Sequence, residues 1–216
     1  MTTELTTRQG PTMATKDSLT KDLRRLVGRA DDLLKETGHA VASVLFGDCN
    51  PSGKLPISFP RSSGHLPCFY NHKPSARRGY IFDDVTALFP FGFGLSYASF
   101  SVGAPILEQS EIGAGETTAV TVEVKNTGSC DGVEVVQMYI RDMVSSVTRP
   151  VKELKGFTRV ALRPGESRTI TFTLGPDQLA FTNIRKERAV EPGAFAIMVG
   201  TSSRDSDLTK AMLRVH

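Results

Sequence analysis

Carboxylates, histidines and serines are the side chains of this chain that could carry chemistry, and their spacing offers little of it. Asp83 and Asp84 are adjacent, so on a strand they would point to opposite faces and could not flank one scissile bond. A turn with two solvated charges accounts for them. His39, His65 and His72 lack the spacing of metal ligands or of a catalytic triad. We therefore predict no catalytic residue in this chain.

Cofactor and metal motifs are missing as well. No serine occupies a GxSxG turn, and Phe91-Gly92-Phe93-Gly94 lacks the third glycine and the following helix of a phosphate-binding loop. Cys49, Cys68 and Cys130 are an odd number without CxxC spacing, which signals neither a disulfide framework nor a zinc site. We expect no cofactor, no metal and free thiols in a reducing compartment.

Charge and hydropathy exclude several classes of partner. The 216 residues carry 26 Lys and Arg against 23 Asp and Glu, a net charge of +3, which is too weak to predict a nucleic-acid partner. No run approaches the roughly 18 apolar residues of a membrane span. The first residues contain no apolar core of a signal peptide, so the sequence as written predicts a cytoplasmic protein that binds no membrane.

Two kinds of segment precede the second half of the chain. Residues 1–15 are polar and rich in threonine, which predicts a disordered tail. Apolar residues from Leu19 to Leu34 follow the spacing of one helical face, so we expect an amphipathic helix over 17–36 that packs on the protein's own body, with a partner or membrane surface as the alternative. Gly38 should break it, and a short second helix should end at Gly47.

The next stretch, Asn50 to Phe91, contains six prolines. Neither a long helix nor a central strand can run through it. Its leucines and aromatic residues are too apolar for a solvated linker, so we expect an extended connector that lies against something.

After Phe100 the period of the pattern changes to two, which is typical of strands with one buried face. Turn signals such as Asn126-Thr127-Gly128 and Arg163-Pro164-Gly165 separate the apolar runs. About seven short strands over roughly 115 residues predict an immunoglobulin-like β-sandwich. The chain has no Trp, which favours the fibronectin type III-like kind. The residues that we expect between the two sheets are Val122, Val124, Val136, Met138, Ile140, Ile170, Phe172, Ile197 and Val199.

The predicted fold is therefore mainly β: a fibronectin type III-like sandwich over 98–216, preceded by helices and a proline-rich connector over 16–97. Sugar-binding modules usually present exposed aromatic rings. The sandwich has no Trp, and its phenylalanines lie mostly at positions typical of a core, which argues against an autonomous carbohydrate platform; they are Phe100, Phe157, Phe172, Phe181 and Phe195.

An ordered set of motifs from about Thr37 to Val215 resembles the late part of glycoside hydrolase family 3, the β-glucosidase and β-xylosidase family. The segments that resemble the end of its α/β domain are Val44-Leu45-Phe46-Gly47-Asp48, Asn50-Pro51-Ser52-Gly53-Lys54-Leu55-Pro56 and Leu88-Phe89-Pro90-Phe91-Gly92-Phe93-Gly94-Leu95-Ser96-Tyr97. Those that resemble its C-terminal fibronectin type III-like domain are Val124-Lys125-Asn126-Thr127-Gly128, Arg149-Pro150, Glu153-Leu154-Lys155-Gly156-Phe157 and Leu162-Arg163-Pro164-Gly165-Glu166.

The resemblance implies where the chemistry of such a protein lies. The family uses an aspartate nucleophile on a barrel and a glutamate acid/base on the α/β domain, about 5 to 5.5 Å apart, and both belong upstream of the match. Residues 1–36 align with neither, so no catalytic residue is carried over. Arg78, Tyr80 and Asp83 are candidates for the rim of the substrate pocket.

The resemblance leads to two interpretations of function. In the first, the chain is the C-terminal portion of a β-glucosidase-like hydrolase of terminal β-glycosides, inactive alone, whose partners are the parent's catalytic domains and a β-glucoside or polysaccharide. In the second, it is a non-catalytic module that binds or stabilises a partner protein or a cell-wall polysaccharide. Under the first interpretation, apolar residues in 40–97 would face water in the absence of the catalytic domains and would favour self-association. The parent family is often periplasmic or secreted.

Overall fold

A computed structural model describes residues 16–76 and 84–216 of the chain, which divides into two compact units, Met1–Cys49 and Asn50–His216. The first unit contains one helix, α1 (Lys16–Leu45). The predicted break at Gly38 is therefore wrong: a glycine costs a helix about 1 kcal/mol relative to alanine but keeps the N–H that a proline would lack. Gly47 follows the helix with φ 85°, as expected of a residue that ends one.

Helix α1 presents large apolar side chains to solvent, among them Leu26, Leu33, Leu34 and Val41. Packing of this face on the rest of the protein remains a sequence prediction. Among the helices of residues 16–76 and 84–216, none is long and apolar enough to cross a membrane.

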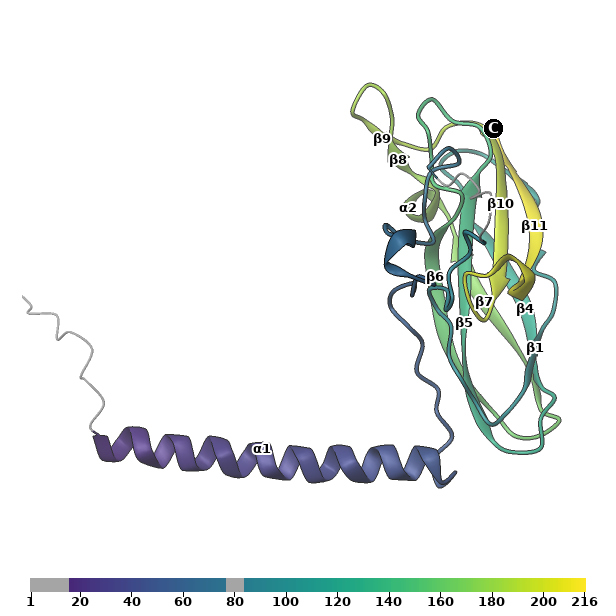
Figure 1. Ribbon diagram of the computed structural model, residues 1–216. Coiled ribbons are helices and arrows are strands. Elements are labelled where there is room, and N and C mark those ends of the chain that lie inside the picture. Colours follow the sequence, from purple (N-terminus) through teal and green to yellow (C-terminus); the bar gives the residue numbers. More distant parts are fainter. Residues whose placement is uncertain (1–15, 77–83) are drawn as a thin grey trace, which may run out of the picture. The chain divides into compact units, whose positions relative to one another are not determined.

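The second unit contains a β-sandwich (Figure 1). One sheet is formed by β1 (Phe100–Val102), β2 (Ile106–Leu107), β4 (Thr118–Asn126) and β7 (Ser167–Leu174). The other has the order β3 (Glu111–Ile112), β11 (Leu208–Val215), β10 (Gly193–Gly200), β5 (Gly132–Asp142) and β6 (Glu153–Leu162). The remaining elements are η1 (Ser63–His65), α2 (Pro176–Leu179), η2 (Asp205–Asp207) and the small sheet of β8 (Phe181–Thr182) and β9 (Arg188–Ala189).

The space between the two large sheets holds the main core, and the predicted alternation places most of it correctly. The side chains of Val122, Val124, Val136, Met138, Ile140, Phe172, Ile197 and Val199 are buried. Ile170 is only partly buried against this core. Phe157 is 66% exposed, because it pairs with Gln137 and lies with it on the outer face of the sheet, so its expected place in the core is wrong. The fibronectin type III-like fold class itself is confirmed.

The opposite face of the five-stranded sheet is also covered, which the alternation does not predict. Gln137 and Tyr139 take the positions that a half-buried strand gives to solvent, yet they are 3% and 0% exposed. Tyr139 packs in a second cluster with Met198 and Leu208, and the connector contributes Tyr70 and Phe91 to it.

Backbone hydrogen bonds fix the connector in its place. Its two arms pair with each other, since Leu55 N donates to Phe93 O and Gly92 N donates to Leu55 O, both at 2.8 Å. Ser203 N then donates to Phe91 O at 2.9 Å, which joins one arm to the loop after β10. The extended, packed connector is thus observed, and it belongs to the same compact unit as the sandwich.

Candidate functional site

The three rim candidates, Arg78, Tyr80 and Asp83, lie outside the described residues. Asp84 is described, and its carboxylate is held within a turn. Oδ2 accepts hydrogen bonds from Arg61 Nη2 (3.2 Å) and Thr86 Oγ1 (2.7 Å), and Oδ1 accepts one from Thr86 N (2.8 Å). This is the structural role that the sequence suggests for it.

The three histidines come from separate places: His39 belongs to α1, His65 to η1, and His72 to the connector, where its carbonyl oxygen accepts a hydrogen bond from Val151 N at 2.9 Å. Within residues 16–76 and 84–216, no group of three or more His, Cys, Asp or Glu side chains is placed to hold a metal ion.

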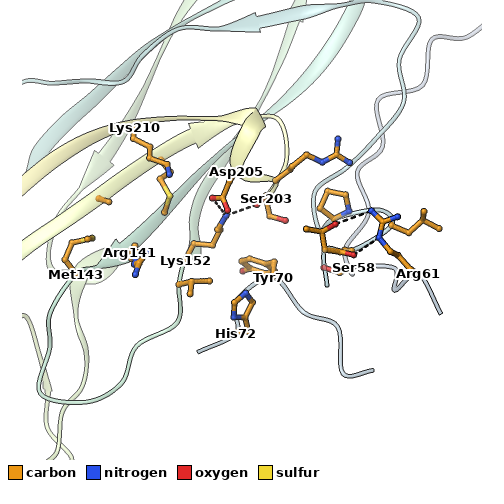
Figure 2. A pocket seen from close by; sticks show the side chains of 18 of the residues that line it. Ser58, Arg61, Tyr70, His72, Arg141, Met143, Lys152, Ser203, Asp205 and Lys210 are labelled. Carbon is orange, nitrogen blue, oxygen red and sulfur yellow. Dashed lines mark hydrogen bonds and ion pairs between the residues drawn. The ribbon is translucent and has the colours of Figure 1, made fainter. Parts of the chain in front are cut away.

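A pocket of about 730 Å³ lies between the connector and the outer face of the five-stranded sheet (Figure 2). Strand register explains its floor: Arg141 on β5, Ala196 on β10 and Met212 on β11 are neighbours in one row across the sheet. The next row places Met198 beside Lys210. These positions alternate with core residues such as Ile140 and Ile197, so their side chains leave the opposite face of the sheet.

The walls come from three further segments. Ser58, Arg61, Tyr70 and His72 belong to the connector, Lys152 precedes β6, and residues 203–205 follow β10. In Figure 2 the labelled side chains of the connector and those of the sheet face one another across the cavity. The site therefore forms only when the connector lies on the sandwich.

Lys152 is the most buried charge of the pocket, at 6% exposure. Its Nζ donates to Ser203 O at 2.9 Å and to Asp205 Oδ1 at 2.7 Å. Burial raises the pKa of Asp205. The hydrogen bond from Lys152 and the charges of Lys152, Lys210 and Arg141 together lower it by more, so its pKa lies below the ordinary value for an aspartate. Asp205 is therefore an anion at neutral pH and compensates one of the cations around it.

Tyr70 forms the aromatic part of the wall. Its ring stacks on Phe91 with centroids 4.3 Å apart and meets Tyr139 edge-on at 5.7 Å. Burial raises the pKa of Tyr70, and it raises that of Tyr139 far more. Both phenols stay protonated at neutral pH and act as hydrogen-bonding groups.

The described lining of this pocket lacks the groups that hydrolyse a glycosidic bond. Among the described residues that line it, Asp205 is the single carboxylate, and its closest partner is a lysine ammonium. Hydrolysis of a glycosidic bond needs two carboxyl groups with different protonation states on either side of that bond. The pocket does not supply that pair.

Sequence reasoning missed this pocket because its lining comes from segments that are far apart along the chain. Arg141 and Lys210 each look like an ordinary polar residue on the solvent face of a strand. Only the register across β5, β10 and β11 brings them together.

Two protein families match the chain. Residues 33–97 match the Glycosyl hydrolase family 3 C-terminal domain, and residues 134–203 match the Fibronectin type III-like domain. The first range ends with the connector, and the second begins on β5.

Relatives agree with these matches. A beta-xylosidase of Formosa agariphila is 52% identical over 182 residues, which are 82% of this chain and 25% of the relative. A periplasmic beta-glucosidase of Salmonella typhimurium is 43% identical over 179 residues, 78% of this chain and 23% of the relative. The chain thus spans about a quarter of the length of these relatives.

Solved structures show the same correspondence. A β-glucosidase from Erythrobacter marinus superposes with a TM-score of 0.79 and 47% identity, over 83% of this chain and 24% of that one. A β-glucosidase from Listeria innocua in complex with glucose gives a TM-score of 0.77 and 38% identity, over 82% of this chain and 26% of that one. This chain corresponds to the C-terminal part of glycoside hydrolase family 3 proteins, fibronectin type III-like domain included.

Proposed function

We propose that this chain is the non-catalytic C-terminal part of a β-glycosidase acting on terminal β-glucosides or β-xylosides. In this role the sandwich holds the connector in a fixed conformation, and the connector docks on the catalytic domains. The names of the relatives, β-xylosidase and β-glucosidase, support the substrate class.

The observation that carries this proposal is the connector, which is partly packed and partly exposed. One part packs on the sandwich through Tyr70, Phe91 and Gln137. Other residues of the connector present large apolar side chains to solvent: Ile57, Leu66, Phe69, Leu95 and Tyr97. Large apolar side chains exposed together on one segment are typical of a site of interaction, and the match to the C-terminal part of family 3 proteins supports the α/β domain as the partner. Without that partner, the same surface would favour the self-association predicted for residues 40–97.

An activity assay tests the first half of the proposal. The purified chain should not hydrolyse aryl β-glucosides or aryl β-xylosides, because the described residues that line its pocket include one carboxylate and not the pair that hydrolysis needs. Turnover that survives rigorous purification would overturn the non-catalytic assignment.

A complementation experiment tests the second half. The β-glucosidase of Erythrobacter marinus, shortened by the quarter that this chain matches, should bind the chain and regain activity when the two are co-expressed. Leu95→Asp, at 73% exposure on the connector, should prevent binding, whereas Val144→Asp, at 80% exposure on the loop after β5, should not. Equal binding by both variants, or no complex with the unaltered chain, would contradict the proposed docking surface.

A further inference from the structure

We propose that the pocket between the connector and the outer face of β5, β10 and β11 binds an acidic saccharide, a sugar of one or two rings that carries a carboxylate. The inference concerns binding by this chain alone, so it stands or falls independently of the proposed glycosidase role.

The first argument is the uneven charge of the pocket. Five cationic side chains line it, Arg61, Arg141, Lys152, Arg204 and Lys210, against Asp205 alone among the described lining residues. Arg61 is paired with Asp84, and Lys152 is paired with Asp205.

Arg141 and Lys210 remain, and they form no ion pair within residues 16–76 and 84–216. The guanidinium of Arg204 lies over the ring of Phe93, with 5.8 Å between its central carbon and the ring centroid. Cations held around one cavity repel each other, and the cavity's low-dielectric walls concentrate their field on an incoming anion. A carboxylate in the pocket would relieve this repulsion and accept charge-assisted hydrogen bonds from the guanidinium and ammonium groups.

A buried serine supplies a second, independent argument. Ser203 lines the pocket, is 5% exposed, and its Oγ has no hydrogen-bond partner in the described structure. Buried polar atoms in native proteins are nearly always paired, so an unpaired one points to a missing partner. A change of its rotamer toward the cavity would let this hydroxyl bond a ligand.

The apolar part of the lining favours a sugar over a free inorganic anion. Met212, which is 51% exposed, and the half-buried ring of Tyr70 add apolar surface to the lining beside the cations. A sulfate or phosphate ion would use the cations and leave this apolar surface uncovered, whereas the C–H face of a sugar ring would cover it.

The volume and the polar rim agree with such a ligand. About 730 Å³ falls within the roughly 300–1,000 Å³ of small-molecule sites. Hydroxyl and imidazole groups of Ser58, His72 and Thr86 also line the cavity and can bond sugar hydroxyls.

The test is calorimetric titration of the full chain at low ionic strength with D-glucuronate, D-glucose and inorganic sulfate. Glucuronate should bind at least about tenfold more tightly than either of the others, since hydrogen bonds to charged groups contribute factors of this size. Raising the salt concentration should weaken it, because Arg204 and Lys210 are exposed.

Two variants test whether glucuronate binds in the pocket. Arg141→Gln and Lys210→Gln should each reduce glucuronate affinity about tenfold, and both remove a side chain that is not part of the core. Lys125→Gln is the matched control: it removes the same charge from an exposed position on β4, in the other sheet. It should bind like the unaltered chain.

Three results would overturn the proposal. Glucose binding as tightly as glucuronate would show that the cationic side chains do not contribute to the affinity. Sulfate binding as tightly as glucuronate would mean an adventitious ion only. Glucuronate affinity unchanged in both pocket variants would place the bound sugar elsewhere on the chain.

Discussion

Gln137 joins the sandwich to the connector, and its replacement by methionine measures how strongly. Its side chain is 3% exposed. Nε2 donates to Gly92 O at 3.1 Å and to Thr201 O at 2.8 Å, and Oε1 accepts the hydroxyl hydrogen of Tyr139. Methionine keeps the size of the side chain but would leave two carbonyl oxygens and one hydroxyl buried without these partners.

The magnitude follows from the number of groups left unpaired. Each buried polar group that loses its partner costs about 1–3 kcal/mol, and partial relaxation of three groups leads us to expect a loss of about 3 kcal/mol. For a unit of this size, each kcal/mol lowers the melting temperature by about 2–4 °C. The expected decrease is therefore about 6–12 °C.

Urea and thermal denaturation of Gln137→Met and the unaltered chain measure the loss. Gln109→Met is the matched control, because Gln109 is exposed and should change stability by less than about 0.5 kcal/mol. Amide exchange should also become faster at Gly92, because its N–H donates to Leu55 O within the connector, which opens more often without Gln137. A loss below about 1 kcal/mol, with unchanged exchange at Gly92, would refute the idea that Gln137 holds the connector.

Three further predictions concern the core, a buried carboxylate and the connector. Phe172→Ala should cost about 3–5 kcal/mol in urea melts, because Phe172 packs in the main core; less than about 1 kcal/mol would contradict its burial. Burial raises the pKa of Asp142 more than the charge of Arg149 lowers it, so ionising this carboxyl group in the folded chain costs stability. The full stability is present below about pH 4, the pKa of the group in the unfolded chain, and part of it is lost as the pH rises through the folded pKa. Asp142→Asn should then be more stable than the unaltered chain at pH 7 and equal to it at pH 3, and equal stability at both would contradict the burial argument. A chain that begins at Ala98 should unfold at lower urea concentration than the full chain, because Tyr139 would lose its cover from the connector; an unchanged midpoint would show that the cover is dispensable.

The inner faces of the sandwich could be predicted from the sequence because burial on one face of a strand imposes a period of two. Val120, Val122 and Val124 on β4 follow that period without interruption and are 0–1% exposed. The same pattern assigns the intervening residues to solvent, which holds for Glu123 and Lys125.

The rule fails on β5, where both faces are covered. Val136 to Ile140 are all buried, and their sequence, Val136-Gln137-Met138-Tyr139-Ile140, contains no charged residue. A strand buried on both faces has such a run, so the signal was present. What covers the second face could not be predicted, because Tyr70 and Phe91 approach Tyr139 from a distant part of the chain.

The candidate pocket was beyond sequence reasoning for a related reason. Arg141 and Met212 become neighbours of Ala196 through the pairing of three strands, and sequence patterning alone does not state which strands pair or in which register. The wrong prediction of a helix break at Gly38 has a different cause. Gly38 lowers helix propensity locally, but its neighbours continue the helix through it.

The connector links the two proposed surfaces. Residues 58–72 supply one wall of the pocket through Ser58, Arg61 and Tyr70, and the same stretch presents Leu66 and Phe69 to solvent. A ligand that bonds the wall and the sheet together would reduce the freedom of this segment. Docking of these apolar residues requires the same ordered conformation, so each event lowers the entropic cost of the other, and by linkage the coupling must be reciprocal. We therefore expect glucuronate to tighten the complex with the catalytic domains by the same factor by which the complex tightens glucuronate.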